Sequence, residues 1–500
     1  MKKDFESESV CVYSHVEEKV SGNTPLRERS AMKRMVFVLD VLVGAVFILG
    51  VFCQSASSLA ADDNSPVWKL RERENISDVW NGVSVGFKFV PRSDAVYVAF
   101  YSYDRSMTIG RYAFDEGKWE LKKLPTKIEW DSHNYVDMAF DSDGILHVSG
   151  NMHASPLVYF RASKPNDIST LERVEQMTGD RERHTTYPRF LNDKEGRTLF
   201  TYRDGSSGNG DQIWNVYDEK SRTWSRLLKT PLFDGEGQMN AYFVGPALGK
   251  DGYFHFAWVW RDSPDCATNH DLSYVRSPDL RRFENSKGEP VELPITLKTG
   301  EIVAPIPAGG GLLNPLVRLS FDQNGRPVLT YTKYDDAGNL QIWNARSENG
   351  QWRCVPCTSW TLPWRFSGGG SIPTELTFSG VSVASPTTLA LSYELVKEKK
   401  RGRIFLDSET LERVDAPTPD AKRTVEPRPE YSPEDAEALN LIESDDPRLL
   451  KKSTTIAVNG ERWIFRWEGP DANRDRPLPD GAPEATQLRV FKFTREGERP

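Results

Sequence analysis

The sequence predicts an all-β fold, and more specifically a seven-bladed β-propeller preceded by an N-terminal signal or anchor segment. Two observations lead to this prediction: a short motif that recurs seven times, and a composition rich in turn-forming and aromatic residues. The 500 residues include 36 Gly, 32 Pro, 14 Trp, 17 Tyr and 24 Phe, which is typical of many short strands joined by turns. No long helical periodicity appears after the N-terminal segment.

The recurring motif is a turn containing Asp, Asn and Gly, followed by a short β-run that ends in polar residues. Four clear copies have their turn glycine at Gly144, Gly196, Gly252 and Gly325. Three weaker copies occupy 94–105, 387–395 and 459–469. Intervals of roughly 50–70 residues are typical of four-stranded propeller blades with loop insertions. Residues 67–72 are expected to add a strand that closes the ring onto the last blade, because closure removes exposed sheet edges.

The first 61 residues are interpreted as a polar extension followed by a signal peptide. Lys33 and Arg34 precede an apolar run from Met35 to Phe52, and Ser58-Leu59-Ala60 offers a small-residue cleavage site. We therefore expect a secreted or periplasmic protein. The apolar run is also close to membrane-spanning length, so an uncleaved segment would anchor the protein and would be its only contact with a membrane.

Residues 62–500 are then expected to form the propeller, with a polar, Pro-rich insertion at about 415–452 that contains a short helix. The net charge of −8 excludes a basic field that would attract nucleic acid. An acidic polysaccharide would need a local basic pocket instead.

Such a pocket is predicted by four cationic or titratable residues that follow the turn glycines at similar distances. Equivalent strands of a propeller end on the same face, so these side chains would lie close together and suit a carboxylate or sulfate. They are His153, Arg203, Arg261 and Lys333.

Three segments resemble the BNR-4 repeat proteins and, within them, the propeller-type ulvan lyases. They are Asp131-Ser132-His133-Asn134-Tyr135 with Gly150-Asn151-Met152-His153, then Arg183-His184-Thr185-Thr186-Tyr187-Pro188-Arg189, and then Phe200-Thr201-Tyr202-Arg203-Asp204. The resemblance covers about residues 75–375. It implies cleavage of a uronic-acid-containing, ulvan-like polysaccharide by β-elimination.

The resemblance further implies a catalytic site of two histidines, a tyrosine and an arginine, which match His133, His153, Tyr187 and Arg203. A second tyrosine matches Tyr242, which we expect to bind substrate together with Arg261 and Lys333.

A uronate lyase removes the C5 proton, α to the carboxylate, and expels the oxygen at C4. Arg203 would neutralise the carboxylate, with His153 as a further donor. Tyr187 or His133 would act as base, and Tyr187 as acid. A tyrosine base needs a lowered pKa, which a nearby arginine favours. Pro188 favours an extended backbone at Tyr187. No metal is required.

Two other functions remain open. A sialidase-like glycoside hydrolase would need paired carboxylates, for which Asp131, Asp137 and Asp204 are available. A noncatalytic glycan-binding propeller is the other, because the fold alone does not establish catalysis.

The resemblance also raises a structural zinc site, for which His255, Cys266 and His270 are the candidate ligands. His255 and His147 each follow a turn glycine by three residues, which is typical of a repeated packing residue. A disulfide, either Cys354–Cys357 or Cys266–Cys354, is the alternative for the cysteines.

Overall fold

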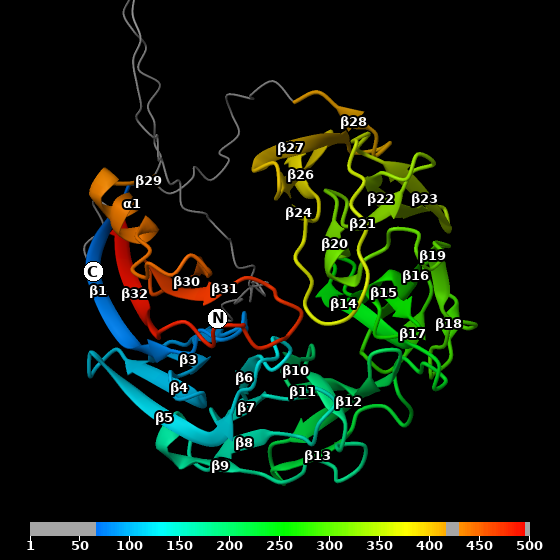
Figure 1. The fold of residues 1–500 in the computed structure, drawn as a ribbon. Helices are drawn as coiled ribbons and strands as arrows, with labels where there is room; N and C mark the ends of the chain where they lie inside the picture. Colours follow the sequence, from blue (N-terminus) through cyan, green and yellow to red (C-terminus); the bar gives the residue numbers. More distant parts are fainter. Residues whose placement is uncertain (1–66, 417–429, 496–500) are drawn as a thin grey trace, which may run out of the picture.

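The computed structural model describes residues 67–416 and 430–495, which form seven β-sheets arranged in chain order around a common centre (Figure 1). The expected signal segment and its cleavage site lie outside the described residues. Within the two described ranges, no helix combines the length and the apolar character needed to cross a membrane.

The sheets are built almost entirely from strands that are neighbours in sequence. The first three sheets along the chain are β2 (Lys88–Pro91), β3 (Ala95–Tyr101), β4 (Ser106–Ala113) and β5 (Lys118–Lys127); β6 (Val136–Phe140), β7 (Leu146–Gly150), β8 (Tyr159–Ala162) and β9 (Leu171–Arg173); and β10 (Thr185–Asn192), β11 (Thr198–Ser206), β12 (Asn209–Asp218) and β13 (Thr223–Arg226).

The next three sheets follow the same order, with one extra strand at the side of the fourth and of the sixth. They are β14 (Asn240–Leu248), β15 (Phe254–Arg261), β16 (Asn269–Ser277), β17 (Phe283–Glu284), β18 (Pro290–Val291) and β19 (Glu301–Ala304); β20 (Arg318–Phe321), β21 (Pro327–Tyr334), β22 (Leu340–Glu348) and β23 (Gln351–Pro356); and β24 (Leu376–Phe378), β25 (Ser382–Ser385), β26 (Thr388–Leu395), β27 (Lys400–Asp407) and β28 (Arg413–Val414).

The seventh sheet unites the two ends of the described chain. Its order is β29 (Glu430–Tyr431), β1 (Val67–Val79), β32 (Thr486–Arg495), β31 (Glu461–Pro470) and β30 (Leu449–Val458). Strand β1 runs antiparallel to β32, from Trp68 opposite Arg495 to Val79 opposite Thr486. The predicted closing strand is therefore confirmed, and it extends beyond residue 72.

Each of the seven repeat copies found in the sequence supplies a strand to a different sheet. These strands are β3, β7, β11, β15, β21, β26 and β31. The turn before β7 shows why the motif recurs. Gly144 has a positive φ of 79°, and the Asp141 carboxylate accepts a hydrogen bond from the backbone N–H of Ile145 at 2.8 Å. Turns with a positive-φ glycine and an Asp carboxylate that accepts from the backbone precede β11, β15 and β21 as well, so this chemistry positions the strand in the four clear copies.

Helices contribute little. In the described part of the chain, three short 3-10 turns occur at Ile168–Thr170, Cys266–Thr268 and Asn314–Leu316. The helix expected in the polar insertion is α1 (Pro433–Asn440), whose N-cap Ser432 accepts a hydrogen bond from the backbone N–H of Asp435.

The core lies between neighbouring sheets. The largest apolar cluster joins the seventh, first and second sheets through side chains such as Phe465, Phe100 and Val148, which are fully buried. Because inward-facing side chains fix how each sheet sits against the next, the connections at the strand ends are held in defined positions.

Candidate active site

The candidate residues come from three successive sheets, at the ends of equivalent strands. Asp131 and His133 lie in the connection between β5 and β6, and His153 directly follows β7. Tyr187 lies in β10 and Arg203 in β11, the neighbouring strands of the next sheet. Tyr242 and Arg261 lie on the paired strands β14 and β15 of the sheet after that.

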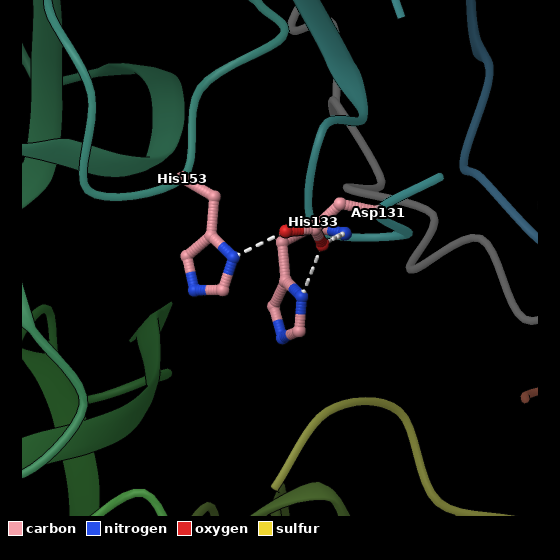
Figure 2. A group of neighbouring side chains, drawn as sticks. All are labelled: Asp131, His133 and His153. Carbon is pink, nitrogen blue, oxygen red and sulfur yellow. Dashed lines mark hydrogen bonds and ion pairs between the residues drawn. The ribbon is translucent and has the colours of Figure 1, made fainter. Parts of the chain in front are cut away.

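Asp131 orients both histidines at once (Figure 2). Its Oδ1 lies 2.7 Å from Nδ1 of His133 and its Oδ2 lies 2.5 Å from Nδ1 of His153. The two rings stack with centroids 4.3 Å apart and an interplanar angle of 25°. Both Nε2 atoms point away from the carboxylate, toward the same side. A carboxylate at Nδ1 fixes ring orientation and leaves Nε2 free for chemistry.

A second carboxylate reaches His133 from the other end of the chain. Oδ2 of Asp475, in the connection between β31 and β32, lies 3.2 Å from the same Nδ1 atom. Although burial opposes its charge, the carboxylates of Asp131 and Asp475 raise the pKa of His133 to about 9. Burial would raise the pKa values of both carboxylates, but hydrogen bonds outweigh it. Bonds from His133 and His153 hold the pKa of Asp131 below its usual range, and a bond from His133 does the same for Asp475. His133 is therefore a cation at neutral pH.

Tyr187 connects the histidine pair to the arginines. Its ring centroid lies 5.7 Å from that of His133 and 6.0 Å from that of Tyr242. The guanidinium carbon of Arg203 lies 5.0 Å from the Tyr187 ring centroid, and that of Arg261 lies 5.3 Å from the Tyr242 ring centroid. A continuous series of contacts therefore joins the three sheets.

Arg203 is held in place by hydroxyl groups. Its Nη1 donates to the Tyr242 hydroxyl and its Nη2 to the Thr186 hydroxyl, both at 3.2 Å. Thr186 Oγ1 also accepts a hydrogen bond at 2.7 Å from the backbone N–H of Ala154, the residue after His153. Gly210 lies against the Arg203 stem, where an added Cβ would come within 2.9 Å of it. Arg203 is only 2% exposed, so its orientation is fixed by packing as well as by hydrogen bonds.

The two tyrosines differ in acidity. Burial, assisted by the neighbouring Tyr242, raises the pKa of Tyr187 well above its ordinary value, and Arg203 only partly opposes this. At Tyr242, the charges of Arg203 and Arg261 outweigh burial and lower the pKa. The lowered tyrosine pKa expected at Tyr187 is therefore found at Tyr242.

The backbone at Tyr187 also differs from expectation. Its φ is +58°, in the left-handed region, rather than extended. The pairing register of β10 and β11 shifts between Thr186 and Arg189, so Tyr187 lies in a β-bulge. A bulge re-aims a side chain, and it overrides the preference that Pro188 imposes.

Known proteins share parts of this sequence and this fold. A family model described as BNR repeat-containing family member matches residues 95–360, more than half of the chain. The chain belongs to the BNR repeat-containing family. The matched residues of this family member include the histidines, tyrosines and arginines described above, but not Asp475.

Two curated relatives have similar sequences. The long-isoform ulvan lyase of Glaciecola sp. (strain KUL10) is 23% identical over 159 residues, which is 31% of this chain and 14% of that protein. The short-isoform ulvan lyase of Alteromonas sp. (strain LOR) is 23% identical over 269 residues, 41% of this chain and 51% of that protein. The chain thus spans about one seventh and about half of the two relatives' lengths.

Solved polysaccharide lyases share the fold. The crystal structure of polysaccharide lyase Uly1 covers 85% of this chain and 99% of its own, with a TM-score of 0.53 and 14% identity. An ulvan lyase bound to -[GlcA(1-4)Rha3S]- covers 79% of this chain and 93% of its own, with a TM-score of 0.51 and 13% identity.

Lys333 does not join the site in this BNR family member. It lies on β21, and its amine sits 5.0 Å from the Trp343 ring centroid rather than against the histidines, tyrosines or arginines. Arg261 does join it, but its guanidinium also donates to the backbone oxygens of Ser263, at 3.0 Å, and Pro264.

The predicted zinc ligands are not brought together, which corrects that expectation. His255 is opposite Arg276 in the β15–β16 ladder, whereas His270 is opposite Trp260. The two histidines are therefore roughly 17 Å apart along the strands. His255 instead bonds the Tyr274 hydroxyl at 2.6 Å, as His147 bonds Tyr159 at 2.7 Å. The repeated histidine is a packing residue.

The cysteines of the described residues are free. Cys266 and Cys357 are buried and Cys354 is half-buried, and no disulfide joins them. The alternative of a Cys354–Cys357 or Cys266–Cys354 bridge is therefore wrong as well.

Among the described residues, one group of three has ligand atoms close enough to hold a metal ion, namely Asp131, His133 and His153. Both Nδ1 atoms face the carboxylate at hydrogen-bonding distance. We therefore assign Asp131 the role of orienting the two rings.

Sequence reasoning missed Asp475, Thr186 and Ser207. The Ser207 hydroxyl lies 2.9 Å from that of Tyr242. Thr186 and Ser207 adjoin recognised motifs, so their positions could have suggested a role. Asp475 lies in a polar loop without a repeat signature, and no local signal identifies it.

Proposed function

We propose that the protein is an exported polysaccharide lyase that cleaves a uronic-acid-containing, ulvan-like glycan by β-elimination, and that its seven sheets are the blades of a seven-bladed β-propeller. The observation that supports this proposal best is the continuous contact of His153, His133, Tyr187 and Arg203 at the ends of two neighbouring sheets. The similarity to ulvan lyases points to the same chemistry.

The positive charges suit a uronate carboxylate. Removing the C5 proton places further negative charge next to that carboxylate, so the reaction needs cationic donors in fixed positions. Arg203 is permanently charged and His133 holds its proton to a pKa of about 9. We assign both the role of neutralising the carboxylate, because a histidine that retains its proton at neutral pH is a poor base.

His153 is assigned as the base. Its Nδ1 faces Asp131, so in the tautomer that donates to this carboxylate the lone pair is on Nε2, which points away from Asp131. Nε2 takes the C5 proton, the C5 electron pair forms the C4–C5 double bond, and the C4–O4 bond breaks.

Tyr187 is assigned as the acid. Its raised pKa keeps the phenol protonated, as an acid that donates to the departing O4 requires. Tyr187 regains its proton from solvent as His153 releases the proton it took. Tyr242, between the two arginines, orients Arg203 through its hydroxyl and contributes to substrate binding.

The hydrolase alternative fits less well because its candidate carboxylates are already engaged. Asp131 holds both histidines. Asp137 pairs with Lys88 at 2.8 Å and accepts from the backbone N–H of Phe190 at 2.7 Å. Asp204 pairs with Arg181 at 2.7 Å. A glycosidase needs two carboxyl groups facing one bond.

Incubation with a panel of uronic acid glycans, including ulvan, tests the proposal. A lyase yields products with an unsaturated uronate, detected by its ultraviolet absorbance. Products with saturated ends would support the hydrolase, and binding without cleavage would support a noncatalytic propeller.

Export is a separate part of the proposal and rests on residues 33–60 of the sequence. N-terminal sequencing of the protein recovered outside the cytoplasm should give a start close to Ala60. An intact N-terminus in the membrane fraction would show an anchored protein instead.

A further inference from the structure

A cavity of about 180 Å³ lies beside the candidate active site, between the seventh sheet and the connection from β1 to β2. Its walls include Trp80, Phe87, Lys452, Trp467 and Glu468. Phe87 and Trp467 stack with ring centroids 4.9 Å apart. The cavity therefore combines an aromatic surface with two charged side chains.

Only one of the two charged groups is available to a ligand. Glu468 is fully buried, and its carboxylate accepts hydrogen bonds from Arg489 at 2.9 Å and from the backbone N–H groups of Glu443 at 2.8 Å and Ser444 at 3.2 Å. Lys452 is 5% exposed, and within residues 67–416 and 430–495 its amine has neither a hydrogen bond nor an ion pair. The acid is satisfied, whereas the ammonium lacks a partner.

An ammonium in the wall of a cavity keeps only part of its hydration and lacks the full set of hydrogen bonds that it makes in bulk water. Burial accordingly lowers the pKa of Lys452, and the carboxylate of Asp471 only partly opposes this. An anion bound in the cavity would supply the missing partner, while the aromatic rings would contact an apolar sugar face.

The cavity adjoins the histidine site through two contacts. The Trp80 ring packs against that of Trp130 with centroids 5.3 Å apart, and Trp130 immediately precedes Asp131. Gly86, in the cavity wall, lies against Tyr135, with 3.4 Å between its Cβ position and that of the tyrosine. The cavity and the histidine site are therefore neighbouring parts of the molecule.

We propose that this cavity is a substrate subsite in which the ammonium of Lys452 binds the acidic substituent, a carboxylate or a sulfate ester, of a sugar residue further along the glycan. The subsite depends on the proposed function for its ligand, an acidic polysaccharide. It does not require that the protein cleave this ligand by elimination. It would make the enzyme selective for chains that carry acidic groups at a fixed spacing.

The test compares Lys452→Met with Lys451→Met, each in the full chain carrying Tyr187→Phe to slow turnover during the measurement. Lys451 is a matched control: it is the preceding residue of β30, is 6% exposed, and donates to the Asn440 side chain at 2.8 Å. Calorimetry measures the Kd of ulvan oligosaccharides of increasing length in native, desulfated and carboxyl-reduced forms.

We expect Lys452→Met to weaken binding of the longer oligosaccharides by about tenfold to a hundredfold. The unfolding temperature should stay the same or rise, because an unpartnered buried charge is removed. Lys451→Met should lower the unfolding temperature and leave Kd unchanged. If Lys452→Met no longer changes the affinity for the desulfated oligosaccharide, Lys452 binds the sulfate. If it no longer changes the affinity for the carboxyl-reduced oligosaccharide, Lys452 binds the carboxylate.

Equal affinities in the Lys452→Met and parent proteins, or no binding of any acidic oligosaccharide, would overturn the subsite. The experiment distinguishes failure of the subsite from failure of the proposed elimination. Binding that depends on Lys452, in a protein whose native form cleaves nothing, would support the subsite and contradict elimination. Elimination by the native protein with an unchanged Kd in Lys452→Met would support elimination and contradict the subsite.

Discussion

Oδ2 of Asp475 lies 3.2 Å from Nδ1 of His133, which joins the last inter-strand connection of the seventh sheet to the connection that leads into the second sheet. The same carboxylate accepts hydrogen bonds from the Ser132 hydroxyl at 2.6 Å and from the Ser371 backbone N–H at 2.9 Å. Three separate parts of the chain therefore meet at one carboxylate. A residue outside the family match therefore supports the charge of His133 together with Asp131.

Replacing Asp475 with Asn should lower the pKa of His133, because one of the two carboxylates that raise it is removed. The titration of His133 followed by NMR measures this directly. We also expect the alkaline limit of lyase activity to move to lower pH. Asp471→Asn, in the same connection, is the control and should leave the His133 titration nearly unchanged. An unshifted His133 in Asp475→Asn would show that Asp475 has no electrostatic role.

Stability should depend on pH through His133. Its pKa of about 9 in the folded protein exceeds the ordinary value of 6.5, so the folded state binds the proton more tightly. The resulting stabilisation is fully present below 6.5 and is lost as the pH rises through about 9. The difference in free energy of unfolding between wild type and His133→Gln should therefore shrink over that interval. A difference that stays constant would contradict the charged state assigned to His133.

Arg203→Gln should reduce kcat by about a hundredfold to a thousandfold, as expected when a donor to a developing negative charge is lost. Arg197→Gln is a suitable control, because Arg197 is half-exposed and immediately precedes the opposite end of β11. The rate of formation of unsaturated product measures both. A loss confined to KM would mean that Arg203 binds substrate without stabilising the transition state.

Treatment with a chelator should leave the unfolding temperature unchanged, because the ladder between β15 and β16 separates His255 from His270. Metal analysis of the purified protein checks the same point independently. One equivalent of zinc, with a lower unfolding temperature after its removal, would mean that other residues of the chain hold the ion.

The sequence predicts the scaffold well because its signals are local. The turns ending at Gly144, Gly196, Gly252 and Gly325 each precede one strand of a different sheet. Inner strands such as β3 and β15 are buried along their whole length, so alternation does not identify a buried face there. The positions of Arg203 and Arg261 at strand ends also predict that their side chains lie at the same end of the ring. The same reasoning fails to predict the side-chain position of Lys333, whose amine lies over the Trp343 ring instead.

Features that depend on distant parts of the chain could not be predicted in this way. The bulge at Tyr187 arises from pairing with β11, and the acidity of Tyr242 arises from arginines on two other strands. Lys452 lies on β30 and Asp475 in the connection from β31 to β32, in a part of the chain that contains one of the three weaker repeat copies. Their roles follow only from the closed arrangement of the sheets.

Elimination at a uronate by the site around Tyr187 leaves a direct chemical signature in the product. Mass analysis and NMR of the products from one defined uronic acid oligosaccharide, for wild type and Tyr187→Phe, test it most directly. We expect a C4–C5 double bond at the new non-reducing end, and a rate lowered by about a hundredfold to ten-thousandfold in Tyr187→Phe with the fold unchanged. Saturated products, or full elimination activity in Tyr187→Phe, would contradict this expectation.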